Sequence, residues 1–269
     1  MRILFVGDIF GRPGRTMVKQ SVPALRRDEG IDLVLANGEN AAGGNGVTVK
    51  IVEELRSAGV DCLTSGNHHW DKREILSYSE GRGGRLLRPL NYPPGTPGIG
   101  SAVLEVGGDA ICGVISLVGR LFMKPTDCPF RVAEEEVERL RDMTNLIIVD
   151  FHAEATSEKQ AFAHFMDGKI SAVLGTHTHV QTADERILPN GTAYITDVGM
   201  TGPFDSVIGI RKDQAIERFI SQLPGRFEVA KGDVRLQAVI VDIGYDGRAT
   251  AIRRIEIHRD EVENAGETD

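Results

Sequence analysis

The residues of this chain best suited to chemistry are two histidines, His177 and His179, which follow an apolar run over residues 172–174 and a glycine. The run predicts a short buried strand that ends at the glycine. Side chains at positions i and i+2 of an extended backbone point the same way, and imidazole is the commonest protein ligand for transition metals. Taken alone, the pair is explained as readily by chance in a loop as by metal binding.

Four other predicted strands end in residues of the same kind. Each hydrophobic run is followed by side chains that offer oxygen or nitrogen ligands: Asp8 after the first run, Glu39 and Asn40 after the second, Asn67 and His68 after the third, and His152 after the fourth. Five such ends are much harder to attribute to chance than one. The pattern therefore predicts a metal site assembled from the ends of strands.

The elements that must position these residues alternate between strand and helix in the first part of the chain. Strands are predicted over residues 2–6, 32–36 and 60–64, with helices over 15–27 and from Thr48 to about residue 58. This alternation predicts parallel strands joined by helices. Later segments continue the pattern, with strands at 146–149 and 170–174 and helices near 133–143, 157–167 and 211–223.

Pairs of β-type runs around glycine-containing turns predict hairpins elsewhere. They join residues 101–106 with 110–117, 186–188 with 192–196, and 235–243 with 248–258. We expect a surface loop over residues 80–100, a flap over 119–131 and a further loop over 197–209. Two sheets with helices outside, an α/β sandwich, fit this order better than a barrel does. Residues 1–258 are predicted to form a single domain, and the acidic residues 259–269 a frayed tail.

The composition is that of a soluble globular protein, with 269 residues, 41% hydrophobic and 26% charged. No stretch approaches twenty apolar residues, so we expect no transmembrane helix, and with a strand predicted from residue 2 we expect no signal peptide. Three cysteines without metal-type spacing are expected to be reduced thiols in a cytoplasmic protein.

The formal net charge of −8 argues against binding to long nucleic acid. It does not exclude a small phosphorylated substrate, because bound cations would reverse the local field. The charge is therefore compatible with a small phosphodiester substrate. The sequence does not decide whether the chain forms a homo-oligomer.

Together the strand ends resemble the calcineurin-like metallophosphoesterase superfamily. The order is Gly-Asp, an acidic strand end, Gly-Asn-His, a lone histidine and Gly-x-His-x-His. The variant is similar to the YmdB-type phosphodiesterases, and it is carried by Gly7-Asp8-Ile9-Phe10, Asn37-Gly38-Glu39-Asn40 and Gly66-Asn67-His68-His69-Trp70-Asp71. These motifs span residues 7–180, and the resemblance implies a four-layer α/β/β/α metallophosphoesterase-like sandwich.

In a two-metal site the ions lie roughly 3.5–4 Å apart and share a bridging ligand. A carboxylate can bridge two cations, so we place Glu39 between them. Asp8, Asn40 and His179 would then serve the first metal, and Asn67, His152 and His177 the second. The superfamily usually has a histidine where this chain has Phe10 and an aspartate where it has Glu39. Asn40 is expected to compensate with its side-chain oxygen.

The first metal would have mainly oxygen ligands, which suits iron or manganese better than zinc. We favour iron, mostly because of the resemblance. The resemblance also makes His68 the proton donor to the leaving oxygen, while His69 is expected to be structural. Two cations lower the pKa of a bridging water and generate the hydroxide that attacks phosphorus. The substrate class implied is small phosphodiesters, in particular 2′,3′-cyclic nucleotides.

Other functions remain open on sequence grounds. A phosphomonoesterase would use the same metal site, and a non-catalytic regulator that binds metal or phosphorylated ligands is a different class. An amidohydrolase barrel also uses His-x-His, but at its first strand, whereas the pair here follows residue 170. Asn45, Lys124 and Thr201 are candidates for substrate contact by loop position alone.

Overall fold

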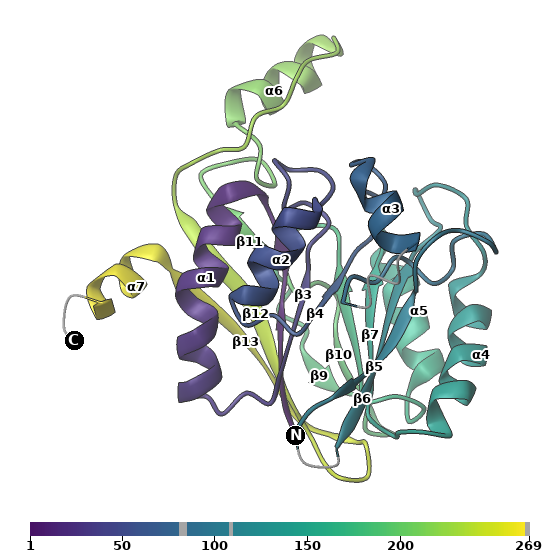
Figure 1. Cartoon of the computed structure of the whole chain (residues 1–269). Helices are drawn as coiled ribbons and strands as arrows, with labels where there is room; N and C mark the ends of the chain where they lie inside the picture. Colours follow the sequence, from purple (N-terminus) through teal and green to yellow (C-terminus); the bar gives the residue numbers. More distant parts are fainter. Residues whose placement is uncertain (81–84, 108–109, 267–269) are drawn as a thin grey trace.

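The computed structural model describes residues 1–80, 85–107 and 110–266, and in them the chain forms two β-sheets covered by helices (Figure 1). The strands of the first sheet lie in the spatial order β2 (Asp8–Ile9), β11 (Met200–Pro203), β12 (Val234–Ile243), β1 (Arg2–Val6), β3 (Leu33–Asn37) and β4 (Cys62–Thr64), and β13 (Ala249–His258) also pairs with β12. Strands β1, β3 and β4 are parallel, as the alternation of strand and helix predicts.

The second sheet is parallel in its centre and antiparallel at its edges. Its spatial order is β5 (Ser101–Glu105), β6 (Ile111–Val118), β7 (Ile147–His152), β8 (Ala172–Thr176), β10 (Ala193–Ile195) and β9 (Arg186–Ile187). The predicted hairpins are confirmed as β5–β6, β9–β10 and β12–β13, although residues 108–109 of the first turn lie outside the described residues.

Helices cover the outer faces of both sheets (Figure 1). The first sheet is covered by α1 (Gly11–Asp28) and α2 (Val49–Ser57), and the second by α4 (Pro129–Arg141) and α5 (Thr156–Met166). The N-terminus of α2 lies where the sequence predicts, because the Thr48 hydroxyl accepts a hydrogen bond from the backbone N–H of Ile51 at 3.3 Å.

Apolar side chains fill the space between successive layers. Met17 of α1 and Val52 of α2 belong to the core between the helices and the first sheet, and Phe162 of α5 belongs to the core on the helix side of the second sheet. Phe5 and Val114 pack between the two sheets. The central parallel strands β1, β3, β7 and β8 are buried on both faces, which explains their nearly continuous apolar sequences. The predicted α/β/β/α sandwich is confirmed.

Several segments differ from the expectations. The predicted loop over residues 197–209 contributes strand β11, and helix α3 (Glu74–Glu80) has no counterpart in the prediction. In the supposed surface loop after residue 80, Leu86 and Leu87 are buried, and Leu86 bridges to Leu63 of β4. Apolar pairs inside a Gly- and Pro-rich segment are too short to show periodicity, so tertiary contacts decide their place.

The acidic C-terminal segment also differs from the expected frayed tail. Residues Arg259–Gly266 form helix α7, and Val262 packs against the apolar core beneath α1. Residues 267–269 lie outside the described residues. Helix α6 (Lys212–Ser221) projects away from the layers (Figure 1). None of the helices in the described parts of the chain has the length and apolar character needed to cross a bilayer.

Candidate metal centre

The predicted ligands come together at one edge of the sandwich. Asp8 follows β1, Glu39 follows β3 and Asn67 follows β4, whereas His152 ends β7 and His177 follows β8. These strands run parallel within each sheet, so their carboxyl ends meet at the same edge. The convergence follows from the topology.

The first donor group consists of Asp8, Asn40 and His179. Asn40 Nδ2 lies 3.4 Å from Asp8 Oδ1 and 3.1 Å from His179 Nε2. His179 Nε2 lies 3.6 Å from Asp8 Oδ1. All three residues are buried.

The second donor group consists of Asn67, His152 and His177. His152 Nε2 lies 3.1 Å from Asn67 Oδ1 and 2.9 Å from His177 Nδ1. His152 is fully buried, whereas His177 is partly exposed.

Glu39 lies between the two groups and contacts both. Its Oε1 is 2.8 Å from Nε2 of His152 and 3.5 Å from Nδ2 of Asn40. Its other oxygen, Oε2, accepts the backbone N–H of His68 at 3.0 Å. The carboxylate therefore joins the two groups of predicted ligands.

The donor set fits a cation. One ring nitrogen, Nε2 of His152, lies within 3.1 Å of three atoms that could bind a metal: a carboxylate oxygen of Glu39, the amide oxygen of Asn67 and Nδ1 of His177. A ring nitrogen carries one proton at most, so hydrogen bonds cannot satisfy all three contacts. Donor atoms of Glu39, His152 and His177 all lie within 4.8 Å of one another. Carboxylate, amide oxygen and imidazole together are ligands for a first-row transition metal.

Asn40 differs from its expected orientation. The sequence predicts that its side-chain oxygen faces the first metal, but its amide nitrogen faces Asp8, Glu39 and His179. The carboxylates of Asp8 and Glu39 present acceptor atoms, which draw an N–H donor towards them. A half turn of the amide would present the oxygen to a cation instead.

Phe10 occupies the position where the superfamily usually has a histidine. Its ring meets the His179 ring edge-on, with the centroids 5.5 Å apart. Phe10 is almost completely buried. The ring thus packs against a predicted ligand without offering a donor atom of its own.

His68 lies beside Glu39 with its side chain partly exposed. Its Nδ1 is 2.8 Å from Oδ2 of Asp71, and the same carboxylate oxygen accepts from Asn45 Nδ2 at 3.2 Å. Asp71 thus holds the His68 ring through Nδ1, with Nε2 on the opposite side of the ring.

A comparison with known proteins decides the family. A family model described as YmdB-like protein matches residues 4–255. The chain belongs to the YmdB-like family. The metallophosphoesterase resemblance is thereby confirmed.

One relative of this YmdB-like chain is a Bacillus subtilis (strain 168) protein named 2′,3′-cyclic-nucleotide 2′-phosphodiesterase. The two are 49% identical over 263 residues, which cover 97% of this chain and 99% of the relative. A hypothetical protein from Thermus thermophilus superposes with a TM-score of 0.90 at 45% identity, covering 96% of this chain and 99% of that one. A novel phosphatase from Mycoplasma pneumoniae gives a TM-score of 0.89 at 38% identity, covering 96% and 93%. The prediction that this chain is a phosphoric diester hydrolase is confirmed.

Burial and charge oppose each other in the electrostatics of the centre. Burial disfavours the charged carboxylates, but His179 holds the pKa of Asp8 below its ordinary value, and His152 does the same for Glu39. Burial likewise opposes a charge on His152, but Glu39 raises its pKa to about 9. Burial and the neighbouring His152 lower the pKa of His177 to about 3. A cation would replace this shared positive charge.

Buried polar residues lie behind the predicted ligands of this YmdB-like chain and were not among the predicted site residues. Asp150 accepts from Asn37 at 3.0 Å and from the Thr176 hydroxyl at 2.7 Å, and that hydroxyl lies 2.9 Å from His152 Nδ1. Asp150 is two residues before His152 in β7, so the period of the strand places both on one face. That spacing is the signal in the sequence that would have found it.

A buried ion pair shapes the loop that carries the two histidines. Lys159 and Asp197, both fully buried, meet at 2.8 Å, and the same Asp197 oxygen accepts the Thr178 N–H at 3.0 Å. His177 and His179 adopt positive φ angles of 103° and 63°. Such angles cost free energy in non-glycine residues, so this framework must hold the loop in place.

The remaining residues singled out in the sequence are His69, Thr201 and Lys124, and they lie in different surroundings. His69 is buried with Nδ1 2.7 Å from the Ser65 hydroxyl, as expected of a structural residue. Thr201 was a candidate for substrate contact. It is instead fully buried and donates to the Gln237 carbonyl at 3.3 Å, so its side chain is not available to a substrate. Lys124 lines a cavity together with Asn67.

Proposed function

We propose that this YmdB-like protein is a phosphodiesterase that opens the cyclic phosphate of 2′,3′-cyclic nucleotides on a dinuclear metal centre. The observation that carries the proposal is Glu39, which contacts both donor groups and also receives the backbone N–H of His68. The activity named for the Bacillus subtilis relative supports the choice of substrate.

The two groups of predicted ligands support the proposal of two cations. Asp8, Asn40 and His179 would hold one, Asn67, His152 and His177 the other, and Glu39 would be shared. Bound cations of this kind lower the pKa of a bound water and stabilise negative charge on phosphoryl oxygens. The oxygen-rich first group favours iron or manganese over zinc, and we favour iron.

His68 is assigned to the leaving oxygen of the sugar. Its Nδ1 is held by Asp71 at 2.8 Å, so an imidazolium donates its proton from Nε2. The P–O bond to the sugar breaks, the sugar oxygen takes that proton, and the phosphate keeps the oxygen that came from water. The product is a nucleoside monophosphate. The carboxylate of Asp71 stabilises the charged ring until transfer.

A substrate screen tests the proposal. Protein reconstituted with iron or manganese should hydrolyse 2′,3′-cyclic nucleotides faster than phosphomonoesters. His152→Ala should abolish the activity, whereas His164→Ala, on the exposed face of α5, should leave it intact. Faster hydrolysis of monoesters than of any diester would instead identify a phosphomonoesterase. Ligand binding without turnover under all metal conditions would identify a regulator.

A further inference from the structure

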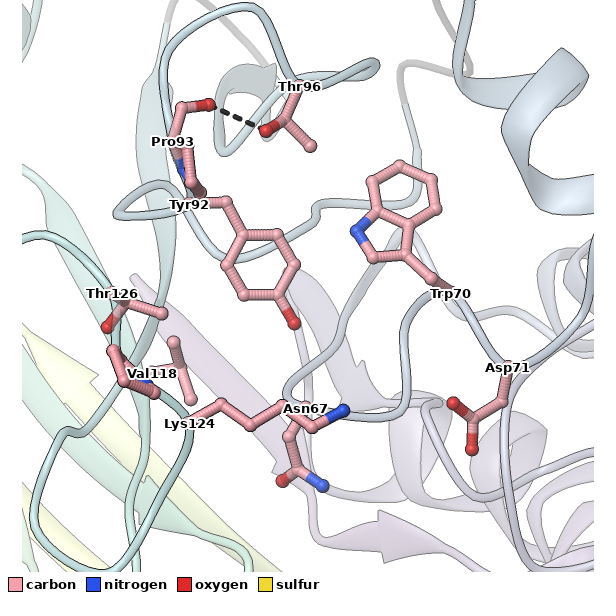
Figure 2. A pocket seen from close by; sticks show the side chains of 10 residues that line it. Asn67, Trp70, Asp71, Tyr92, Pro93, Thr96, Val118, Lys124 and Thr126 are labelled. Carbon is pink, nitrogen blue, oxygen red and sulfur yellow. Dashed lines mark hydrogen bonds between the residues drawn. The ribbon is translucent and has the colours of Figure 1, made fainter.

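A cavity of about 240 Å³ opens next to Asn67, and the chemistry proposed above leaves most of its lining unused. Figure 2 shows the rings of Trp70 and Tyr92 in this cavity, with Asn67 and Lys124 towards one end. Because Asn67 belongs to the second donor group, the cavity begins at the metal centre and leads away from it between aromatic side chains.

The two aromatic rings are held in place by their neighbours. The Tyr92 hydroxyl donates to the Gly66 carbonyl at 3.1 Å. The Trp70 ring meets the buried His69 ring edge-on, with centroids 4.3 Å apart. Both aromatic residues remain partly exposed. Rings that are fixed yet open to solvent are preorganised for contact with a flat ligand, because little side-chain freedom is lost on binding.

We propose that this cavity is the nucleobase subsite, in which Trp70 and Tyr92 stack on the base while the phosphate reaches the metal centre past Asn67. The inference rests on the proposed function and extends it to the part of the substrate that does not react. Lys124, a cation on the predicted flap at the same end as Asn67, would pair with a phosphoryl oxygen.

The size and chemistry of the cavity favour a single base. Drug-sized ligands occupy roughly 300–1,000 Å³, so this smaller cavity suits one ring system rather than an oligonucleotide. Every base has a π-face, and stacking on aromatic side chains tolerates all of them. The enzyme should therefore accept purine and pyrimidine cyclic nucleotides with modest preferences.

A second cavity of about 630 Å³ is the competing location. It is lined by His68 and Phe10 and bounded by Phe227. This cavity also adjoins the reacting groups, so a base could in principle be directed into it. Phe227→Ala is therefore the matched control for Trp70→Ala, because each removes one aromatic wall from one cavity.

The first experiment compares kcat/KM for a 2′,3′-cyclic nucleotide with that for glycerol 1,2-cyclic phosphate, a cyclic diester without a base. Trp70→Ala should lower the ratio of the two values roughly 5- to 150-fold, which corresponds to the loss of one stacked base. Trp70→Phe should restore most of the ratio, and Phe227→Ala should leave it unchanged. The ratio cancels any loss of metal or folded protein, since both substrates meet the same preparation.

The second experiment needs no turnover. Trp70 is the one tryptophan in the sequence, so intrinsic fluorescence reports on this cavity. Adenosine 3′-monophosphate should change the emission saturably, and ribose 5-phosphate should change it far less. Tyr92→Leu should weaken the adenosine 3′-monophosphate response by a similar factor to that seen in the activity ratio.

The outcomes separate the subsite from the activity. If wild-type protein hydrolyses neither cyclic diester, the proposed function fails, and the fluorescence titration alone decides the subsite. If both diesters are hydrolysed and Trp70→Ala leaves their ratio unchanged, the subsite is overturned while the activity stands. A ratio that falls in Phe227→Ala instead would move the base to the cavity beside His68. Equal fluorescence responses to adenosine 3′-monophosphate and ribose 5-phosphate also contradict the proposal.

Discussion

Glu39 is the residue on which the two halves of the candidate centre depend. It contacts His152 in one donor group and Asn40 in the other, and it is fully buried. A buried carboxylate without cationic partners would be strongly disfavoured. Shared positive charge from two ions would stabilise it, whereas a neutral amide in its place would bridge poorly.

Replacing Glu39 by glutamine should therefore reduce metal content at both sites. Asn40→Ala, in contrast, should weaken mainly the first metal, because Asn40 contacts Asp8 and His179 but neither Asn67 nor His177. Metal analysis after reconstitution with iron measures both effects, and wild-type protein from the same preparation is the reference. Equal and mild losses in the two variants would argue against Glu39 as the bridge.

His68 can act either as an acid or as a stabiliser of phosphate charge, and the leaving group distinguishes these roles. A sugar alkoxide needs a proton as the P–O bond breaks, whereas a nitrophenolate does not. General acid catalysis contributes roughly 10²–10⁴-fold. His68→Ala should lose about that factor on a 2′,3′-cyclic nucleotide and far less on a nitrophenyl phosphodiester.

Metal content provides the control for the His68 experiment. The variant leaves the side chain of Asn67 untouched, and Glu39 meets the backbone N–H rather than the ring of His68, so metals should remain bound. Equal losses on both substrates, with metals retained, would make His68 a stabiliser of phosphate charge. Loss of metal together with activity would reduce it to a structural role.

At the scale of elements, the sequence predicts the ends of strands better than the segments between them. The parallel strands have apolar runs that end in glycine or polar residues, and these boundaries are set locally. Strand β11 and helix α3 depend on distant partners. Met200 pairs with Asp8, almost two hundred residues away, and no local pattern encodes that contact.

The predicted ligands could be gathered from sequence because parallel strands place their carboxyl ends together. Their orientations could not. The amide of Asn40 and the positive φ angles of His177 and His179 depend on neighbours such as Asp8 and the Ile208 carbonyl. Asp150 could have been predicted from its spacing of two residues from His152 in a strand. Trp70 and Tyr92, in contrast, share a cavity only through tertiary folding.

Gly209 shows how a loop is fitted around a predicted ligand. Its φ angle is +100°, and a Cβ added there would lie 2.5 Å from Cδ1 of Phe10, whose ring packs on His179. Gly209→Ala should therefore destabilise the fold by about 1–3 kcal/mol for the backbone angle, and further for the clash. Thermal unfolding measures the loss.

Gly95→Ala is the matched control for that substitution. Gly95 also has a positive φ, +84°, but an added Cβ would meet nothing within 4 Å. The control should show the cost of the backbone angle alone. Equal losses in the two variants would mean that the Phe10 ring yields freely and does not fix the loop beside His179.

At the scale of the whole molecule, the core between the two sheets contains two thiols that respond to pH. Burial raises the pKa of Cys62 and Cys112 to about 12, from 9.0 for an ordinary thiol. Between these values the unfolded chain releases a proton that the folded chain retains. The free energy of unfolding should therefore fall as pH rises from about 9 towards 12, by up to about 1.4 kcal/mol per pH unit for each thiol.

Urea unfolding at several alkaline pH values measures this slope. Cys62→Ala should be less stable than wild type at pH 8 but lose stability less steeply above pH 9. Val114→Ala, which shortens a buried side chain of the same core without removing a titrating group, should keep the wild-type slope. Parallel curves for all three proteins would show that the thiols do not govern the alkaline response.

The candidate centre also connects the two sheets, because Asp8, Glu39 and Asn67 follow strands of the first sheet, whereas His152 ends a strand of the second and His177 follows one. Ions bound there would stabilise the sandwich as a whole.

Elemental analysis of anaerobically reconstituted protein should approach two transition-metal ions per chain. A site kept at one hundred times its dissociation constant contributes about 2.7 kcal/mol, and a domain of this size loses roughly 2–4 °C per kcal/mol. Chelation should lower the midpoint of thermal unfolding by roughly 5 °C or more, with a chelator already saturated with the reconstituting metal as the control. A stoichiometry at or below one ion, or a midpoint unchanged by chelation, would contradict a dinuclear centre that holds the sheets together.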